Sequence, residues 1–268
     1  MALLVLPGTI HGADNWTTSI DEQNLTLQSR PYSGSALQEI RGTTHLKTSL
    51  NAVMALLKDA PFNSQWVYRS GGAKILAEDG YTSAYVYGIV DAPWPMQDRD
   101  TVVRFDYQQA DSGEITIDII NFPAYLPPEP GYVRVPDFGG FWQLRPISAD
   151  CIEVVYQVYG DPGGWIPVWI ANLAAQASVE RTLKNMPSAV ARYRNAHSDH
   201  VRETPAQNTK GTVCENTRTG SWIRSKSCSG TYYLGLQPTL IPNAAIVAML
   251  ITKKTLRGNA GDRPITRF

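Results

Sequence analysis

Residues that nucleophilic catalysis needs are scarce in this sequence. Its 268 residues include 4 histidines, at positions 11, 45, 197 and 200, and none of them lies in a predicted strand. A catalytic nucleophile needs a base within hydrogen-bond reach, and histidine is the base used most often. The sequence also has no G-x-S-x-G elbow, G-x-G-x-x-G turn, phosphate-binding loop or C-x-x-C pair. We therefore predict no catalytic residues and no bound cofactor.

Metal ligands at a recognisable spacing are also missing. His197, Asp199 and His200 lie close together in the sequence, and Cys214 and Cys228 follow them. Because their spacing matches no known zinc pattern, no metal site is predicted.

The 3 cysteines cannot all pair with one another. Cys151 lies in an apolar strand and is interpreted as a small buried hydrophobic residue. Cys214 and Cys228 could form a disulfide only in an oxidising compartment.

Net charge is zero overall but unevenly divided along the chain. Residues 1–203 hold 15 Lys and Arg against 22 Asp and Glu, whereas residues 204–268 hold 9 against 2. Hydrophobic periodicity also ends near His197, so residues 197–268 are treated as a basic tail of unknown order. Such a tail either attracts an anionic partner or is no part of the fold. We expect no nucleic-acid partner.

Two apolar segments bear on localisation. Residues 1–15 read either as a truncated secretory signal without its basic leader or as a plain apolar N-terminus. If residues 1–13 are a signal remnant, the protein is periplasmic or secreted, and otherwise it is cytoplasmic. Residues 229–252 are uncharged and long enough for a membrane span, but Pro238, Pro242 and nearby amide residues argue against one.

The segments between residues 16 and 196 show helical and strand periodicities. Apolar residues between Thr43 and Lys58 recur at helical spacing, with Thr43 or Thr44 as the expected cap. After Pro61, short alternating segments separated by tight turns predict an antiparallel meander. These strands are predicted at 65–70, 74–79, 81–90, 100–109, 114–121, 132–135, 141–147 and 150–160, with earlier ones near 16–20 and 25–29.

One hairpin can be predicted in register. A three-residue loop ending in Gly113 would pair Phe105 with Ile119 and Tyr107 with Ile117. Alternation then gives one apolar face and one polar face, and Arg104 lies on the polar face as a solvated ion-pair partner of nearby aspartates.

A long helix is predicted to begin near Pro167, whose fixed φ suits a first helical turn. Apolar residues at 169, 173, 179, 183, 186 and 190 form one stripe, and Pro187 should kink or locally break the helix. The predicted fold is therefore α+β, with a curved antiparallel sheet of seven to nine strands that grips a long C-terminal helix.

Aromatic side chains at alternate strand positions are abundant. They are consistent with a plain core, and equally with an internal cavity, because one curved sheet around one helix cannot close on itself. A lipid-like ligand would gain about 0.8 kcal/mol for each methylene group removed from water.

Three motifs resemble the START family of StAR-related lipid-transfer domains, especially its stand-alone bacterial members. They are DAPWPMQDRDTV (91–102), FWQLRP (141–146) and GDPGGWIPVWIANLAAQ (160–176). The resemblance runs from about Trp16 to Tyr193, some two thirds of the chain, and the START-like lipid-binding domain is taken as residues 16–196. It implies a helix-grip fold with a tunnel for one hydrophobic ligand, closed by the C-terminal helix. Arg99 and Asp100 are interpreted as a structural pair at the start of a strand.

The resemblance also implies a set of ligand-binding residues on the concave strand face and the C-terminal helix. These residues are Phe105, Tyr107, Ile117, Trp142, Tyr156, Trp169 and Leu173. Some family members carry a buried charge in the tunnel, and Phe105 stands at that position here. The expected function is non-catalytic binding or transfer of a lipid, sterol or fatty-acyl ligand, with transient membrane contact. The alternative is a cyclase or aromatase acting on a polyketide-like substrate, which would need titratable groups in the cavity.

Overall fold

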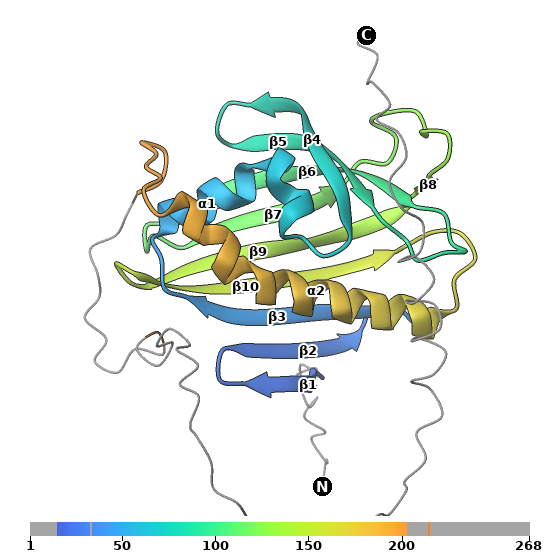
Figure 1. Cartoon of the computed structure of the whole chain (residues 1–268), viewed down its shortest axis with the longest axis horizontal. Helices are drawn as coiled ribbons and strands as arrows, with labels where there is room; N and C mark the ends of the chain where they lie inside the picture. The colour runs from blue at the N-terminus through green and yellow to red at the C-terminus, as the bar shows by residue number, and fades with distance from the viewer. Residues whose placement is uncertain (1–14, 33, 203–213, 215–268) are drawn as a thin grey trace, which may run out of the picture.

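The chain forms one large antiparallel sheet with its helices on one face (Figure 1). The computed structural model describes residues 15–32, 34–202 and 214. Nine strands follow the hydrogen-bonded order β1-β2-β3-β10-β9-β7-β6-β5-β4, and β8 pairs with β6 in parallel. The strands are β1 (Thr17–Glu22), β2 (Leu25–Pro31), β3 (Gln38–Leu46), β4 (Ser70–Asp79), β5 (Ser83–Val90), β6 (Arg99–Gln109), β7 (Ile115–Asn121), β8 (Val133–Arg134), β9 (Asp137–Ser148) and β10 (Cys151–Asp161).

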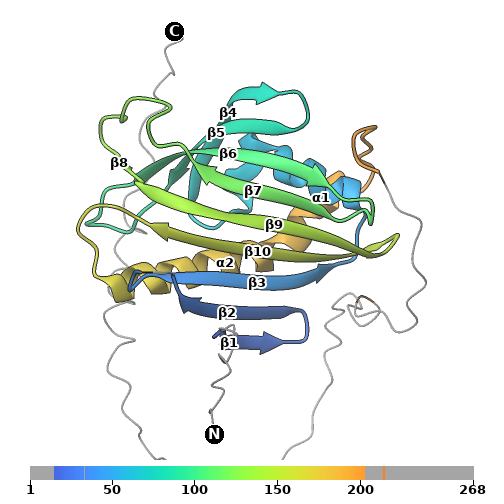
Figure 2. The ribbon, with the colours of Figure 1, turned by 180° about the vertical axis from the view of Figure 1, so that it is seen from behind.

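The helices lie on the same face of this sheet, which we call the inner face. They are α1 (Leu50–Lys58) and α2 (Val168–Val190), accompanied by 3₁₀ segments at Ala60–Gln65 and Ala191–Tyr193. Seen from behind, the sheet lies in front of both helices (Figure 2). The predicted α+β helix-grip arrangement is confirmed.

Two predicted boundaries in the N-terminal part are wrong. Thr43 and Thr44 belong to β3, and the first helix begins at Leu50 with Ser49 as its cap. The residues of β3 alternate between the two faces of the sheet, and this period of two outweighs the helical spacing that Leu46 suggested. The predicted strand at 65–70 is replaced by the end of the 3₁₀ segment, and β4 begins only at Ser70.

The predicted hairpin between β6 and β7 is confirmed in register. Phe105 pairs with Ile119 and Tyr107 with Ile117. Gly113 has φ +86°, the left-handed conformation that glycine adopts without strain. Arg104 lies on the polar face, where its ion pair is with Asp106 at 2.7 Å.

Helix α2 sits on the β3 side of the inner face because Gly42 leaves room for it. A Cβ atom at Gly42 would lie 2.3 Å from Leu183 Cδ1 and 2.7 Å from Val179 Cγ1. Both of these α2 side chains are fully buried. The predicted start of the helix is confirmed within one residue, since Pro167 is its N-cap, and the helix continues through Pro187 to Val190.

Cys151 differs from its sequence interpretation. Cys151 is buried at the start of β10, but it forms a disulfide with Cys214. Because Cys214 pairs with Cys151, the disulfide between Cys214 and Cys228 that the sequence allowed is not formed. The expectations for residues 1–14, for the basic tail beyond Arg202 apart from Cys214, and for the uncharged segment 229–252 lie outside the described residues, as does Cys228 itself.

The packing of α2 against Gly42 gives a first prediction. Gly42→Ala should destabilise the protein by about 1–3 kcal/mol, because the added methyl overlaps two buried side chains of α2. Gly88→Ala is the matched control, since its Cβ would meet only Thr101 Oγ1, at 3.1 Å. Urea unfolding of both variants measures the difference, and equal free energies of unfolding would contradict this account of the helix seat.

Candidate functional site

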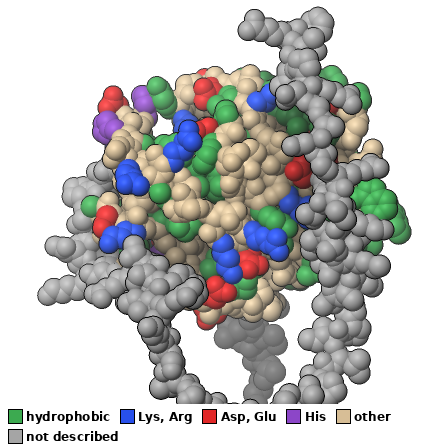
Figure 3. Space-filling model, viewed as in Figure 1, with side chains coloured by type: hydrophobic (Ala, Val, Ile, Leu, Met, Phe, Trp, Pro, Cys, Tyr) green, Lys and Arg blue, Asp and Glu red, His purple; other side chains and the backbone are tan. Residues whose placement is uncertain are grey.

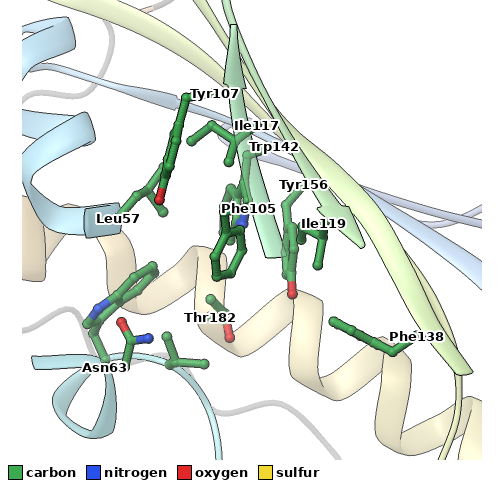
Figure 4. Close-up of a pocket in the computed structure, with 12 residues that line it drawn as sticks. Leu57, Asn63, Phe105, Tyr107, Ile117, Ile119, Phe138, Trp142, Tyr156 and Thr182 are labelled. Carbon is green, nitrogen blue, oxygen red and sulfur yellow. The ribbon is translucent and has the colours of Figure 1, made fainter. Parts of the chain in front are cut away.

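A pocket of about 120 Å³ lies between the inner face of the sheet, α2 and the segment that follows α1 (Figure 4). We call it the inner pocket. Its lining residues are Leu57, Asn63, Trp66, Val67, Phe105, Tyr107, Ile117, Ile119, Phe138, Trp142, Tyr156 and Thr182. They come from α1, the 3₁₀ segment and the two residues after it, strands β6, β7, β9 and β10, and α2.

The floor of the pocket is one row of side chains that crosses four strands. Tyr107, Ile117, Trp142 and Tyr156 are successive cross-strand partners in β6, β7, β9 and β10. The rings of Trp142 and Tyr156 stack at 3.8 Å between centroids and 7° between planes. The same row continues from Tyr156 to Gly42 in β3, so α2 occupies the glycine end and the pocket lies over the aromatic end.

The next row of the sheet explains why the floor is hollow. It runs from Phe105 through Ile119 and Gly140 to Val158. Gly140 has φ +149°, and a Cβ atom there would lie 2.0 Å from the carbonyl oxygen of Gln157. No side chain can stand at this position, so the row has a gap between Ile119 and Val158.

The roof is tied to α2 by two polar contacts. Thr182 Oγ1 accepts a hydrogen bond from the Tyr68 backbone N–H at 3.1 Å. Asn185 Nδ2 donates to the Trp66 carbonyl at 2.8 Å. The segment between α1 and β4 is therefore held against α2, which fixes Trp66 over the floor, with its ring centroid 6.4 Å from that of Trp142.

The described lining of the inner pocket contains no Asp, Glu, Lys, Arg or His. Its titratable groups are tyrosines, and burial raises the pKa of both Tyr107 and Tyr156 well above the usual value. The described residues also contain no group of three His, Cys, Asp or Glu that could hold a metal ion. The pocket is thus an apolar, aromatic space with a few neutral polar groups.

Comparison with known proteins gives the family. An uncharacterised protein of Pseudomonas aeruginosa is 32% identical over 177 residues, which cover 66% of this chain and 87% of that protein. A crystal structure of a STAR-related lipid transfer protein from Xanthomonas axonopodis is 36% identical with a TM-score of 0.62, and the match covers 66% of this chain and 99% of that one. The chain belongs to the family of STAR-related lipid transfer proteins.

A more distant relative is the phosphatidylcholine transfer protein of Rattus norvegicus. It is 24% identical over 189 residues, which cover 68% of this START chain and 86% of that protein. No protein-family model matches the chain.

The START fold brings together five of the seven predicted site residues. Phe105, Tyr107, Ile117, Trp142 and Tyr156 all line the inner pocket. Their contact with a ligand stays a prediction.

The other two predicted site residues, Trp169 and Leu173, lie outside the inner pocket. Their exposed fractions are 55% and 52%. At about 100° per residue, Leu173 is about 120° around the helix from Val179, which marks the buried face. The sequence stripe joined both residues to that face, because a list of apolar positions does not reveal which side of a helix meets the sheet.

Several lining residues were missed by the sequence analysis. Phe138 and Ile119 follow from the same strand alternation that identified Trp142 and Ile117, so the signal was present. Trp66 had been assigned to a strand, and Asn63 and Thr182 carry no distinguishing pattern. Their place in the pocket depends on how the 3₁₀ segment packs on α2, which only the tertiary structure reveals.

The START motifs around Arg99 position loops at one end of the sheet. Asp100 is fully buried and pairs with Arg134 at 2.8 Å, so the predicted Arg99–Asp100 pair is wrong. Arg134 also donates to the carbonyls of Pro123, Leu126 and Pro127, which fastens the loop between β7 and β8. Arg99 instead donates to the carbonyls of Gln97 and Pro162, which joins the PWPMQDRD motif to the turn before α2.

Large apolar side chains are exposed at the start of α2. Trp165 is 94% exposed, and Val168, Trp169 and Leu173 follow it on the first turns of the helix. Trp94 is exposed on the loop before β6, which Arg99 links to the turn before α2. The space-filling view shows hydrophobic side chains scattered over this face of the molecule (Figure 3).

Within the described residues, no helix has the length and apolar character needed to span a membrane.

The tyrosines of the inner pocket give a second prediction. In the folded protein, Tyr107 and Tyr156 should stay un-ionised at about pH 11, because the pocket cannot solvate a phenolate. Tyrosinate absorbance at 295 nm should therefore be equal in the wild type and in the variant with both residues changed to Phe. In urea both tyrosines should titrate near pH 10.

This difference in protonation between the folded and unfolded states determines how stability changes with pH. The folded state keeps two protons that the unfolded state releases, so stability falls as the pH rises above about 10. Ionisation of either tyrosine near pH 10 in the folded protein would show that water fills the pocket.

Proposed function

We propose that this START domain binds a hydrophobic ligand of the lipid type in the inner pocket and does so without catalysis. The observation that carries the proposal is the row of Tyr107, Ile117, Trp142 and Tyr156 facing α2 with no charged side chain among the described lining residues. Such a surface recognises apolar area rather than a reacting group.

The size of the pocket sets a condition on binding. Pockets for small molecules measure about 300–1,000 Å³, and the inner pocket measures about 120 Å³. A long acyl chain therefore enters only if the walls move apart. Each methylene group then gains about 0.8 kcal/mol on leaving water, which for a chain of several methylenes can offset a modest cost of opening.

The first turns of α2 are the segment that we propose to move, although they do not line the pocket and Asn172 and Gln176 hydrogen-bond to Gln38 at the start of β3. Within residues 168–178, Ala171 is buried, whereas Trp169 and Leu173 are exposed. The main buried contacts of α2 lie later, at Val179, Leu183 and Met186. The loop between β7 and β8 is a weaker candidate, because Arg134 fastens it through three carbonyls and the buried Asp100. Closure by α2 is thus proposed as a hinge in its N-terminal half.

Transient membrane contact is part of the proposal. The exposed side chains at the start of α2 include two tryptophans, Trp165 and Trp169, and tryptophan favours the interface between lipid and water. Docking of these residues on a bilayer would place the N-terminal end of α2 at the source of the ligand. The cyclase or aromatase alternative called for titratable groups in the cavity, and those among the described lining residues are Tyr107 and Tyr156, which burial keeps neutral by raising the pKa of each.

Binding in the inner pocket gives a third prediction. Phe105→Asp should lower the affinity for diphenylhexatriene, a neutral apolar dye, by at least about tenfold, because it places a carboxylate among apolar groups. Gln108→Asp is the matched control, since Gln108 is exposed on the same strand. Fluorescence titration measures both affinities, and an unchanged affinity in Phe105→Asp would remove the inner pocket as the binding site.

Membrane contact gives a fourth prediction. A variant with Trp165→Ala and Trp169→Ala should transfer a fluorescent lipid between vesicles about tenfold more slowly and bind the dye in solution with unchanged affinity. Stopped-flow transfer assays check this. Unchanged transfer would show that ligand exchange does not use this end of α2.

A further inference from the structure

We propose that Tyr68, Arg69 and Arg181 form a binding site for a phosphate-type oxyanion next to the inner pocket. This goes beyond the proposed function, because the described lining residues of the pocket carry no charge. The site lies where the residues before β4 meet α2, and the Tyr68 backbone N–H donates to Thr182 Oγ1 at this junction. Val67 and Thr182, the sequence neighbours of Tyr68 and Arg181, both line the inner pocket. The anion site therefore borders the pocket without being part of it.

Two arginine side chains converge on one hydroxyl oxygen. Arg69 Nε donates to Tyr68 Oη at 3.2 Å, and Arg181 Nη1 donates to the same oxygen at 3.0 Å. Both guanidinium groups also lie against the Tyr68 ring, at 5.4 Å and 4.7 Å from its centroid. The two positive charges are thereby held close together, and their mutual repulsion is relieved only if a negative charge lies nearby.

No carboxylate within the described part of the chain compensates these two charges. Neither Arg69 nor Arg181 forms an ion pair with another described residue. Asp91 offers Arg69 Nη1 its backbone carbonyl, at 3.5 Å, rather than its carboxylate. Glu180, which precedes Arg181 in α2, is paired with Lys184 at 2.9 Å. A bound anion would supply the missing negative charge.

Arg69 occupies a backbone position that favours glycine. Its φ is +55°, and no other non-glycine residue among those described has a positive φ. It is the third residue of a turn that the Ser70 N–H closes on the Val67 carbonyl at 3.1 Å, and its own carbonyl accepts from the Asp91 N–H at 2.8 Å. Glycine would adopt this conformation without strain. The presence of arginine here indicates a role for its guanidinium group.

The arrangement suits an anion with several oxygen atoms. Each guanidinium group presents a planar fork of N–H donors that matches the oxygens of a phosphate. The Tyr68 hydroxyl accepts from both forks and keeps one O–H donor, which no described hydrogen bond uses. Tyr68 and Arg69 are half-buried and Arg181 is exposed, so an anion can reach the site from solvent. A carboxylate has only two oxygens, whereas a phosphate has enough for both forks and the hydroxyl.

Titration of the full-length protein with inorganic phosphate, followed by ³¹P NMR, tests the site. Arg181→Ala should lower the affinity for phosphate by at least about tenfold, because one of the two charged forks is lost. The variant should fold, since Arg181 is exposed on α2 and alanine favours helix. Arg192→Ala is the matched control, because Arg192 is also exposed but lies alone over a ring, that of Phe62, at 4.8 Å. Its affinity for phosphate should equal that of the wild type.

A second variant separates anion binding from folding. Arg69→Gly should lower the affinity for phosphate by at least about tenfold, while its midpoint in urea unfolding should not fall below that of the wild type. The reason is that glycine adopts a φ of +55° without strain. A lower urea midpoint together with unchanged phosphate affinity would show that Arg69 serves the fold alone, and would overturn the proposal.

A second ligand, dihexanoyl phosphatidate, distinguishes a lipid head group from a free phosphate ion. If it binds at least about tenfold more tightly than inorganic phosphate, and Arg181→Ala weakens it, the site takes a lipid head group. If it binds no more tightly, the site takes free phosphate. Failure of both compounds to bind the wild type, or equal losses in Arg181→Ala and Arg192→Ala, would overturn the proposal. Dye binding in the inner pocket is measured separately, so either result leaves the proposed function standing.

Discussion

The close packing of α2 on Gly42 is the constraint on which the rest of the structure depends. Because strand β3 has no side chain at this point, Val179 and Leu183 rest directly on the sheet. The helix is thereby drawn to one side of the inner face. The other side, where Tyr107, Ile117, Trp142 and Tyr156 form their row, is covered by the shorter segment after α1. A space between helix and sheet follows from this asymmetry.

The polar groups are distributed so that this space stays free of charge. Asp100 and Arg134 fasten the loops at one end, and Arg99 connects two motifs that are about 60 residues apart in the chain. On the other side of the sheet, Glu39 accepts hydrogen bonds from Gln157 and Arg30. The described lining of the pocket itself keeps only neutral polar groups, namely tyrosine hydroxyls, an amide, a threonine hydroxyl and indole N–H groups.

The sequence predicted those parts of the fold that depend on local periodicity and turn chemistry. The register of β6 with β7 follows from Gly113 and the alternation around it, and the start of α2 follows from Pro167. The motifs around Arg99 and Gly163 identified the family. Five of the predicted site residues line the pocket because strand alternation alone places them on one face.

The remaining features depend on tertiary contacts that no local pattern encodes. Trp169 and Leu173 are apolar yet exposed, because the first turns of α2 meet β3 through Asn172 and Gln176 instead. The partner of Asp100 is 34 residues away, and the disulfide partner of Cys151 is 63 residues away. Trp66 lines the pocket because the 3₁₀ segment packs on α2, and no local sequence pattern predicted this packing.

The central claim is that the space over the aromatic row, between α2 and the segment after α1, holds the apolar part of a ligand. Anomalous diffraction from crystals grown with methyl 9,10-dibromostearate tests it most directly, because bromine marks the position of the chain. The account predicts bromine density between Trp142 and Thr182, with the first turns of α2 displaced outward. Bromine density confined to the outer surface of the molecule, with the pocket unchanged, would contradict it.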